Sequence, residues 1–577
     1  MKAQLNHWFT STGKKSLTII PVILLVLICA CDRDAEDLKV SADPQFSWFT
    51  YEGNDTVFEE FVPGENEYQN PIIAGFYPDP SIVRAGEDYF TVHSSFSFYP
   101  GIPLFHSKDL VNWTQIGHVL DRPSQINFDG LEISHGVFAP TINYHDGTFY
   151  VLSTIVYGGG NFLVTTDDPW GSWSDPVWLP EADGIDPSIF FDDDGKVYIL
   201  HNGPPHREPL YDGHRAIWMW EYDPVDEKLL GEETIIVDGG VDITQEPIWI
   251  EAPHLMKIDG EYILIAAEGG TGPNHSQVVF RAEAPFGPYI PYENNPILTQ
   301  RHLDPDRPYP VGYTGHADFV ETQNGEWWTV FLGVRPYEGN YFNTGRETFL
   351  LPVRWEDGWP IILEGEQTVP YIHTKPNLPE QPSPPIPTTG NFKYTDDFSN
   401  NDLAPYWTFI RTPDEQWYEL SDRTNRLRIK ARPYRLSDRM QPSFIGRRQQ
   451  HAHAMVSTKM YYRPEESGDA AGLAAFQNDD FYYFLCATLD EDNNTVIQLE
   501  ERVHGDSRVI ASEQIDLSDD APLFLQLEAR GNYYNFYYSY DSDEWIMLKE
   551  HADGTILSTQ VAGGFVGTII GMYAYSD

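Results

Sequence analysis

Apolar and polar residues alternate in short runs along most of this chain, and turn residues separate the runs. Five of the runs open with a similar head: Asp79-Pro80-Ser81-Ile82, Ala139-Pro140-Thr141-Ile142, Asp186-Pro187-Ser188-Ile189, Ala252-Pro253-His254-Leu255 and Ala317-Asp318-Phe319-Val320. Each head is followed by an acidic or glycine-containing turn and then by an aromatic-rich run, as in Asp146-Gly147-Thr148-Phe149-Tyr150. Period-two alternation on both sides of a short turn predicts a β-hairpin, so the chain is expected to form this hairpin five times.

The spacing of the five heads predicts the architecture of the first domain. Successive heads are 60 (79 to 139), 47 (139 to 186), 66 (186 to 252) and 65 (252 to 317) residues apart. Such a period is long enough for four short strands, and helical periodicity is nearly absent. Five four-stranded units that close in a ring form a five-bladed β-propeller, with the innermost strands along the axis and the heads at one mouth.

A proline-rich stretch separates the propeller region from a second domain. Residues 376–390 are dense in proline, which cannot pair within a sheet, and we interpret them as a semi-rigid linker. Residues 391–577 again alternate in short runs and predict a β-sandwich. The chain is therefore expected to be all-β, with five parts in order: a signal peptide (1–30), an acidic tether (31–68), the catalytic propeller (69–375), the linker (376–390) and the sandwich (391–577). Phe46, Trp48 and Phe49 would allow the tether to be packed in part.

The N-terminus is expected to be a targeting segment. Lys14 and Lys15 precede an apolar run that ends at Ala30 and is too short to span a bilayer. The small residue followed by Cys31 resembles a bacterial lipoprotein signal, cleaved before Cys31 and lipidated on its sulfur. The acidic run 32–37 resembles the export signal of surface lipoproteins in the Bacteroidetes. We therefore expect a lipid anchor in the bacterial outer membrane, at the cell surface or the periplasmic face; the alternative is an ordinary secreted protein.

Charge and cysteine content narrow the range of partners. The formal net charge of -50 argues against nucleic acid or anionic lipid, because both are bound by clusters of Lys and Arg. Membrane contact is thus expected through the lipid anchor only. The aromatic fraction of 14% suits a protein that stacks against sugar rings, but aromatic all-β cores have the same composition. Beyond Cys31 only Cys486 remains, so no disulfide framework is expected, and Cys486 is predicted to be a core thiol.

Carboxyl groups stand at or beside three of the five heads. Asp79 and Asp186 occupy the head position itself, and Glu251 comes one residue before the fourth head. Equivalent positions of a ring of repeats converge in space, so these three side chains should meet at one mouth of the propeller. Hydrolysis of a glycosidic bond with inversion needs a carboxylate base for water and a protonated carboxyl for the leaving oxygen. For one such motif alone a capped strand-entry turn would be the better interpretation; the set favours catalysis.

The motifs resemble glycoside hydrolase family 43, most closely its β-xylosidase and α-L-arabinofuranosidase branch. The likeness covers residue 69 to the end and rests on these segments: Asn70 to Arg84, Gly184-Ile185-Asp186-Pro187-Ser188, Glu251-Ala252-Pro253-His254, Gly315-His316-Ala317, Gly345-Arg346-Glu347-Thr348, and, for the concanavalin-like (jelly-roll) sandwich of that branch, Asp396-Asp397-Phe398, Leu427-Arg428 and Arg447-Arg448. The resemblance implies that Asp79 is the general base, Glu251 the general acid and Asp186 the residue that tunes and orients the acid.

The resemblance also implies substrate-binding roles. Arg346 would bind a sugar hydroxyl or pair with a catalytic carboxylate, and an ion pair with Glu347 is the structural alternative. Phe96 and Thr271 match pocket positions, and Phe138 stands where xylosidases of the branch usually carry Trp, which leaves the choice of sugar open. For Phe96 and Phe138, plain core packing is the alternative.

His316 is expected in the register of Glu251 in the fifth repeat, near the pocket floor. There it would contact substrate or help to hold a divalent ion, and a hydrogen-bonded core histidine is the alternative. No cofactor is expected for the chemistry, while the resemblance allows a structural or activating calcium ion.

Together these features predict an inverting exo-glycosidase that releases a terminal pentose from hemicellulose oligosaccharides. The first expectation is β-D-xylose, as in a xylan 1,4-β-xylosidase, and the alternative on the same scaffold is α-L-arabinofuranose. A non-catalytic surface glycan-binding lipoprotein is the competitor of another class. A retaining hydrolase of fructosides would instead need its carboxyls about 5 Å apart, against about 6.5–9.5 Å for inversion. The sandwich is expected to pack against the propeller and to narrow the pocket entrance.

Overall fold

The computed structural model of the protein describes residues 43–421, 424–517 and 521–577, and most of their regular structure is β-sheet. The helical segments in these ranges are short: α2 (Thr56–Glu60), η1 (Ile243–Gln245), η2 (Glu338–Asn340), η3 (Gly554–Leu557) and α3 (Thr559–Ala562). None of the helices found there is long and apolar enough to cross a membrane. The expected signal peptide, Cys31 and the first part of the expected tether lie outside the described residues.

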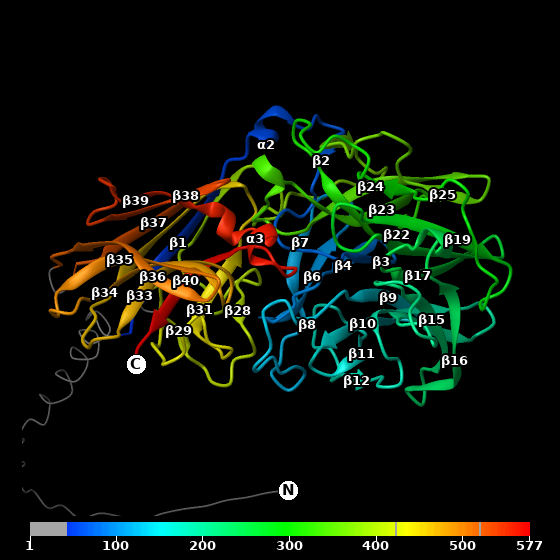
Figure 1. The fold of residues 1–577 in the computed structure, drawn as a ribbon, viewed down its shortest axis with the longest axis horizontal. Coiled ribbons are helices and arrows are strands. Elements are labelled where there is room, and N and C mark those ends of the chain that lie inside the picture. Colours follow the sequence, from blue (N-terminus) through cyan, green and yellow to red (C-terminus); the bar gives the residue numbers. More distant parts are fainter. Residues whose placement is uncertain (1–42, 422–423, 518–520) are drawn as a thin grey trace, which may run out of the picture. The chain divides into compact units, whose positions relative to one another are not determined.

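Five antiparallel sheets correspond to the five predicted repeats (Figure 1). The first contains β3 (Ser81–Ala85), β4 (Asp88–Val92), β6 (Gly101–Ser107) and β7 (Thr114–Leu120). The second contains β8 (Gly136–Val137), β9 (Thr141–His145), β10 (Thr148–Val156), β11 (Gly160–Thr166) and β12 (Val177–Trp178). The third contains β13 (Ile185–Phe191), β14 (Val197–Gly203), β15 (Ala216–Asp223) and β16 (Lys228–Asp238).

The last two sheets complete the ring. The fourth contains β17 (Glu251–Ile258), β18 (Glu261–Glu268), β19 (Ser276–Ala282), β20 (Ile290–Pro291) and β21 (Leu298–Thr299), and the fifth contains β22 (Gly312–Glu321), β23 (Trp327–Val334), β24 (Glu347–Glu356) and β25 (Trp359–Ile361). Strands β3, β9, β13, β17 and β22 contact one another in turn, and β22 contacts β3, so these strands close a ring. Strands β2 (Glu67–Gln69) and β26 (Ile372–Thr374) pair and tie the two ends of this region together. The predicted five-bladed β-propeller is therefore confirmed.

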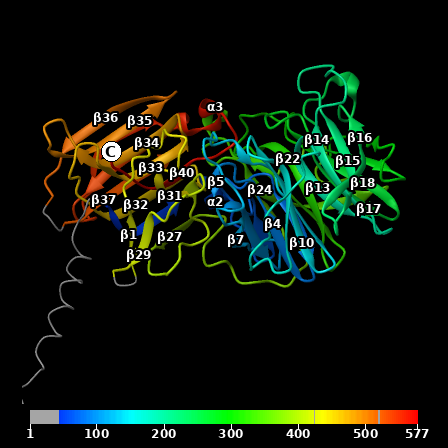
Figure 2. The same ribbon diagram turned by 90° about the horizontal axis from the view of Figure 1, so that it is seen from below.

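Two further sheets form the predicted β-sandwich (Figure 2). One contains β1 (Gln45–Gly53), β27 (Phe392–Asp396), β29 (Tyr418–Ser421), β30 (Arg426–Ile429), β32 (His453–Tyr461), β37 (Leu523–Arg530), β38 (Tyr533–Ser539) and β39 (Ile546–Asp553). The other contains β31 (Ser443–Arg448), β33 (Ala470–Asn478), β34 (Phe481–Leu489), β35 (Thr495–Val503), β36 (Asp506–Gln514) and β40 (Ile569–Tyr575). Cys486 is a buried, free thiol in β34, as expected.

Strand β1 shows that residues 45–53 of the expected tether are packed throughout, beyond the partial packing that Phe46, Trp48 and Phe49 suggested. It lies inside the sandwich, antiparallel to β30, β27 and β32, and Figure 1 shows it in blue beside strands of the C-terminal half. A bulge between Phe46 and Trp48 breaks the alternation, so that Phe49 and Tyr51 are buried as well as Phe46. Burial of these aromatic side chains outweighs the acidic, polar character from which a tether was inferred.

The propeller and the sandwich share one continuous core. Strands β5 (Phe98–Tyr99) and β28 (Phe409–Ile410) pair across the boundary, and one cluster of buried apolar side chains runs from the first two blades into the sandwich. The proline-rich residues 376–390 contain no strand, and Thr388 accepts a backbone hydrogen bond of 2.8 Å from Ala74 in the propeller. The linker therefore packs along the propeller.

Candidate active site

The same irregularity in the strand pairing recurs in three of the blades and places head residues at the axis. Ile185 pairs with Asn202 and Ser188 with Leu200, which leaves Asp186 in a bulge. Glu251 is followed by the same bulge in β17, and Gly315 by the same bulge in β22. The first bulged residues are Asp186, Ala252 and His316, with φ of 54°, 49° and 51°, and Asp79, two residues before β3, has φ of 54°.

This register corrects one prediction. His316 corresponds to Asp186 and Ala252, not to Glu251, whose counterpart in the fifth blade is Gly315. Positive φ is costly for residues other than glycine and persists where the surrounding structure enforces it, typically at functional sites. The sequence pattern aligned the fifth head on Ala317 because it could not show which residue takes the left-handed conformation.

One cavity of about 270 Å³ brings the predicted site residues together. Its lining includes all eight: Asp79, Phe96, Phe138, Asp186, Glu251, Thr271, His316 and Arg346. It also includes Trp249 and Phe565, which the sequence analysis did not single out. Asp79 and Asp186 are 4% exposed and Glu251 is 8% exposed, so the three carboxyl groups lie in a site largely shielded from bulk water.

Asp79 is held in its ionised form. Arg346 donates from Nη1 to Oδ1 at 2.5 Å and from Nη2 to Oδ2 at 3.3 Å, and the Ser94 hydroxyl donates to Oδ2 at 2.5 Å. Burial by itself would raise the pKa of Asp79, but the guanidinium of Arg346, together with His316 and the Ser94 hydrogen bond, outweighs it and lowers the pKa below the usual value. The fork geometry of Arg346 also fixes the orientation of this carboxylate.

The other two carboxyl groups behave in the opposite way. Burial, and then the negative charge of Asp79, raises the pKa of Asp186 to about 7, although the Ala252 N–H donates to Asp186 Oδ2 at 3.2 Å. Burial, and then the charges of Asp186 and Asp79, raises the pKa of Glu251 well above its usual value. Among the described residues none donates a hydrogen bond to the Glu251 carboxyl group. The cavity thus pairs one ionised carboxylate with a carboxyl group that retains its proton.

His316 is neutral and does not suit a metal ion. Burial lowers the pKa of its imidazole to about 3, and its Nδ1 lies 3.9 Å from Asp79 Oδ1. That same oxygen already receives the Arg346 guanidinium, whose positive charge would repel a cation. No group of three or more His, Cys, Asp or Glu side chains within the described ranges could hold a metal ion. The residues around His316 therefore do not fit the calcium ion that the resemblance allows.

An aromatic wall closes the cavity, and one of its members comes from the sandwich. Phe565 stacks on Phe96 with ring centroids 5.8 Å apart, and Phe138 meets Phe96 edge-on at 5.1 Å. The backbone N–H of Phe565 donates to Ser134 Oγ at 2.9 Å, which anchors its loop on the propeller. The expected narrowing of the entrance by the sandwich is thus seen in the cavity lining. In the sequence, the one indication that Phe565 has a special role is that this aromatic residue lies among glycines, in Gly563-Gly564-Phe565-Val566-Gly567.

Trp249 forms another part of the rim that sequence reasoning missed. The Arg215 guanidinium lies 3.9 Å from the centroid of the Trp249 ring, which is a cation–π contact. Its positive charge partly offsets the rise of the Glu251 pKa. The sequence showed Trp249 only as an apolar neighbour of Glu251, and its position at the cavity depends on the loop that precedes β17.

Comparisons with known proteins agree with this geometry. The family model "Glycosyl hydrolases family 43" matches residues 68–360, and "Beta xylosidase C-terminal Concanavalin A-like domain" matches residues 395–577. A "Xylosidase/arabinosidase" of Butyrivibrio fibrisolvens is 40% identical over 510 residues, which cover 88% of this chain and 96% of the relative. The "Non-reducing end alpha-L-arabinofuranosidase BoGH43B" of Bacteroides ovatus is 37% identical, with 88% and 92% covered.

Solved structures show the same likeness. The crystal structure of a "GH43_12 retrieved from capybara gut metagenome" has a TM-score of 0.86 at 38% identity and covers 93% of this chain and 100% of its own. The xylan beta-1,4-xylosidase of Bacillus halodurans C-125 has a TM-score of 0.80 at 33% identity, with 88% and 96% covered.

Proposed function

The chain belongs to glycosyl hydrolases family 43 and is a glycoside hydrolase, and from this premise we propose that it removes one pentose at a time from the non-reducing end of hemicellulose oligosaccharides, with inversion at the anomeric carbon. A cavity of about 270 Å³ is small even for an ordinary ligand site and suits a single monosaccharide. Relatives named for xylosidase and arabinosidase activities support a pentose. We place β-D-xylose first.

In the proposed mechanism two carboxyl groups act on opposite sides of the sugar. Ionised Asp79 accepts a proton from water while the water oxygen bonds to the anomeric carbon. Glu251 donates its proton to the glycosidic oxygen as the bond between that oxygen and the anomeric carbon breaks. Asp186 raises the pKa of Glu251 and keeps it protonated between turnovers. The observation that carries the proposal is the opposite displacement of the Asp79 and Glu251 pKa values on the walls of one cavity.

The remaining lining residues would bind the sugar. Arg346, besides aligning Asp79, presents a guanidinium edge to the cavity, and His316 in its neutral form can accept or donate a hydrogen bond to a hydroxyl. Phe96, Phe138 and Phe565 would pack against the apolar face of the ring, and Thr271 lies at the rim. The chemistry is carried by side chains alone, so treatment with EDTA should leave the turnover number unchanged.

The test of the proposal is the anomer released first. Hydrolysis of a β-xyloside followed by proton NMR should give α-xylose before mutarotation. Release of β-xylose would favour a retaining mechanism, as in a fructoside-type propeller hydrolase. A wild-type protein that binds xylo-oligosaccharides without turnover would favour the surface glycan-binding alternative.

An α-L-arabinofuranosidase on the same scaffold is the second candidate. Phe138 stands where the resemblance expects Trp, and it forms part of the aromatic wall of the cavity. Rates on 4-nitrophenyl β-D-xyloside and 4-nitrophenyl α-L-arabinofuranoside, measured side by side, decide between the two sugars.

We also propose, from the sequence alone, that the enzyme is lipidated on Cys31 and anchored in the outer membrane. Metabolic labelling with a fatty acid should mark the wild-type protein and not a Cys31→Ala variant. Unlabelled wild-type protein in the culture medium would contradict the anchor.

A further inference from the structure

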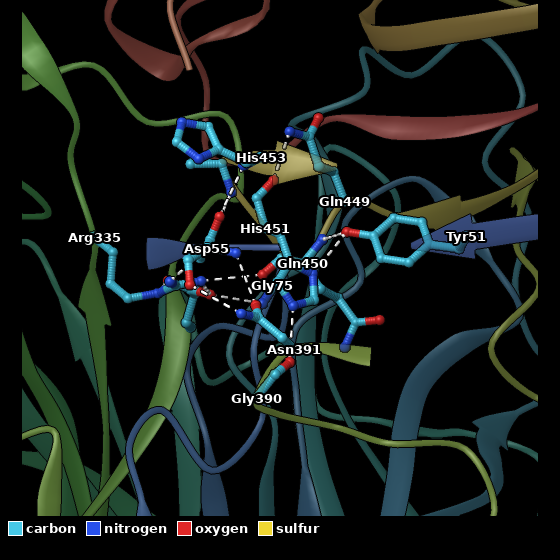
Figure 3. A network of polar contacts seen from close by, with 12 residues as sticks. Tyr51, Asp55, Gly75, Arg335, Gly390, Asn391, Gln449, Gln450, His451 and His453 are labelled. Atoms are coloured by element: carbon cyan, nitrogen blue, oxygen red, sulfur yellow. Dashed lines mark hydrogen bonds and ion pairs between the residues drawn. The ribbon is translucent and has the colours of Figure 1, made fainter. Parts of the chain in front are cut away.

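A buried ion-pair network lies beside the catalytic cavity without lining it. Arg335 donates from Nε to Glu347 Oε2 at 2.7 Å, from Nη2 to Glu347 Oε1 at 2.9 Å and from Nη1 to Asp55 Oδ2 at 2.9 Å. All three side chains are at most 8% exposed. We call Asp55, Arg335 and Glu347 the Arg335 network; Figure 3 shows Asp55 and Arg335 pointing toward one another.

The Arg335 network joins three distant parts of the chain. Arg335 and Glu347 belong to the fifth blade, while Asp55 follows strand β1. Asp55 accepts backbone hydrogen bonds from His453 at 2.8 Å and from Ala452 at 3.2 Å, both in the sandwich, and Arg335 Nη2 donates to the Gln450 carbonyl at 3.0 Å. Arg335 is therefore bound by the propeller, the N-terminal segment and the sandwich at once.

The Arg335 network also reaches the catalytic base through Glu347. The N–H of Gly75, four residues before Asp79, donates to Glu347 Oε1 at 2.8 Å. A Cβ at Gly75 would lie 2.8 Å from Gln450 Cγ, so the sandwich presses directly on this segment. Arg346 is the chain neighbour of Glu347, and its side chain points the other way, into the cavity.

The segment before the catalytic base Asp79 and the segment that carries Arg346 are hydrogen-bonded to one another next to Glu347. The Tyr77 N–H donates to the Arg346 carbonyl at 3.2 Å, and the Thr348 hydroxyl donates to the Tyr77 carbonyl at 2.7 Å. Glu347 holds both segments, since its carboxylate binds Gly75 and its backbone carries Arg346. A shift of Glu347 would move Arg346 and the segment before Asp79 relative to one another.

We propose that Asp55, Arg335 and Glu347 are positioning residues that keep Arg346 aligned with Asp79 and make this alignment depend on the docked sandwich. The inference rests on the proposed role of Asp79 as the base. The charged and titratable groups that face Asp79 are Arg346, His316, His275, His93, Asp186 and Glu251. Those that face Asp55 are Arg335, Glu347, His451, Tyr51 and Tyr371. Arg346 is the strongest of the favourable charges on Asp79, so the acid limb of activity reports its position.

The test is the pH dependence of kcat/KM on an aryl pentoside with the full-length Asp55→Asn variant. Loss of the Asp55 charge should loosen Arg335 and Arg346 and thereby raise the pKa of the base, Asp79. The acid limb of the pH profile should then move to higher pH by roughly half a unit to one unit, because a nearby guanidinium shifts a carboxyl pKa by about one to three units in all. A purely structural role would lower the melting temperature without moving this limb.

Asp479→Asn is the matched control. Arg411 donates to both Asp479 carboxylate oxygens, at 2.8 and 3.0 Å, and to the Leu131 carbonyl in the propeller, so this buried pair also lies at the boundary of the two domains. It has no contact with Glu347 or Arg346. The control should lose stability to a similar degree and keep the wild-type acid limb.

A milder variant keeps the test possible if Asp55→Asn does not fold. The amide of Asn391 accepts from the Asp55 N–H at 2.7 Å and donates to the Asp55 carbonyl at 3.0 Å, and its side chain is exposed. Asn391→Ala should move the limb in the same direction by less. If active Asp55→Asn and Asn391→Ala proteins both keep the limb of the Asp479→Asn control, the inference is overturned. A wild type without any turnover would overturn the proposed function, and this inference with it.

Discussion

The catalytic cavity and the Arg335 network contain the same kinds of groups in different proportions. In the Arg335 network one guanidinium serves two carboxylates, Asp55 and Glu347, and hydrogen-bonds both of them. In the cavity the one bound guanidinium, Arg346, hydrogen-bonds Asp79 and neither Asp186 nor Glu251. Both regions are buried, so burial does not distinguish the reactive carboxyl groups from the structural ones.

The difference lies in how many donors reach each carboxyl group. Glu347 accepts two hydrogen bonds from Arg335 and one from the Gly75 N–H, whereas Glu251 receives none from the described residues and faces two like charges. Burial raises the pKa of Glu347 too, but Arg335 and the Gly75 N–H oppose this shift and stabilise the ionised carboxylate in a fixed position. A buried carboxyl group without donors keeps its proton and can give it to a leaving group. Four predictions test this contrast, in order of decreasing expected effect.

Glu251→Gln removes the proton donor and leaves the shape of the cavity unchanged. Turnover of xylo-oligosaccharides should fall by roughly 10²–10⁴-fold, the usual contribution of a general acid. A 4-nitrophenyl pentoside should lose much less, because its leaving group departs without protonation. Steady-state rates on both substrates provide the measurement, and equal losses on the two would contradict the assignment of the acid.

Arg335→Met leaves two buried carboxylates without their partner. Unfolding in urea should show a loss of about 3–5 kcal/mol, the range found when one member of a buried ion pair is removed. Arg354→Met is the control, since Arg354 pairs with Glu356 and Glu364 in an exposed setting and should change stability by less than about 1 kcal/mol. Equal losses of unfolding free energy in the two variants would show that the Arg335 network does not stabilise the fold.

Asp186 and Glu251 in the cavity should affect stability with the opposite pH dependence to Asp55 in the Arg335 network. Asp186 and Glu251 have pKa values in the folded state above those of the unfolded chain, so the folded state binds more protons and stability falls as pH rises above about 4.5. Asp55 has a lowered pKa, so its contribution is present above about pH 4 and is lost as pH falls through the folded-state value.

This sign difference gives a stability prediction for Glu251→Gln. At pH 8 the variant should be more stable than the wild type, and the gain should vanish near pH 4, where Glu251 is protonated in both the folded and the unfolded chain. Urea unfolding at the two pH values measures it. A variant less stable than the wild type at pH 8 would show that the cavity carboxyl groups do not repel one another.

Asp186→Asn should change the pH profile more than the maximal rate. Removing this negative charge lowers the pKa of Glu251, so the basic limb of kcat/KM should move down by about one unit. The acid limb, set by Asp79, should move little, because Arg346 and the hydroxyl of Ser94 hold Asp79 ionised. If the basic limb stays at the wild-type position, Asp186 does not raise the pKa of Glu251.

The sequence predicted the ring and the cavity because both depend on local repeats. Asp79 and Asp186 stood at equal positions of a hairpin pattern, and Glu251 one residue away, so their convergence followed from the propeller. The register of His316 was wrong by one residue, because a bulge is defined by backbone conformation and leaves no fixed residue type.

Contacts between the domains could not be predicted from the local alternation of apolar and polar residues. Asp55 lay in a stretch predicted as a tether, since the bulge in β1 hid its alternation, and its partners are 280 and nearly 400 residues away. Phe565 needed the docking of the sandwich to reach the cavity. Long-range pairs of this kind have no local periodicity for a single sequence to display.

The central claim is that hydrogen-bond donors separate two buried carboxyl groups whose pKa values burial raises: Glu251, which receives none from the described residues, carries a proton, while Glu347, bound by Arg335 and the Gly75 N–H, is ionised. Infrared difference spectroscopy at about pH 6, wild type minus Glu251→Gln and wild type minus Glu347→Gln, tests it directly. The first difference should show the carbonyl stretch of a protonated carboxylic acid, and the second only the bands of an ionised carboxylate. A purely ionised signal for Glu251 would contradict the account.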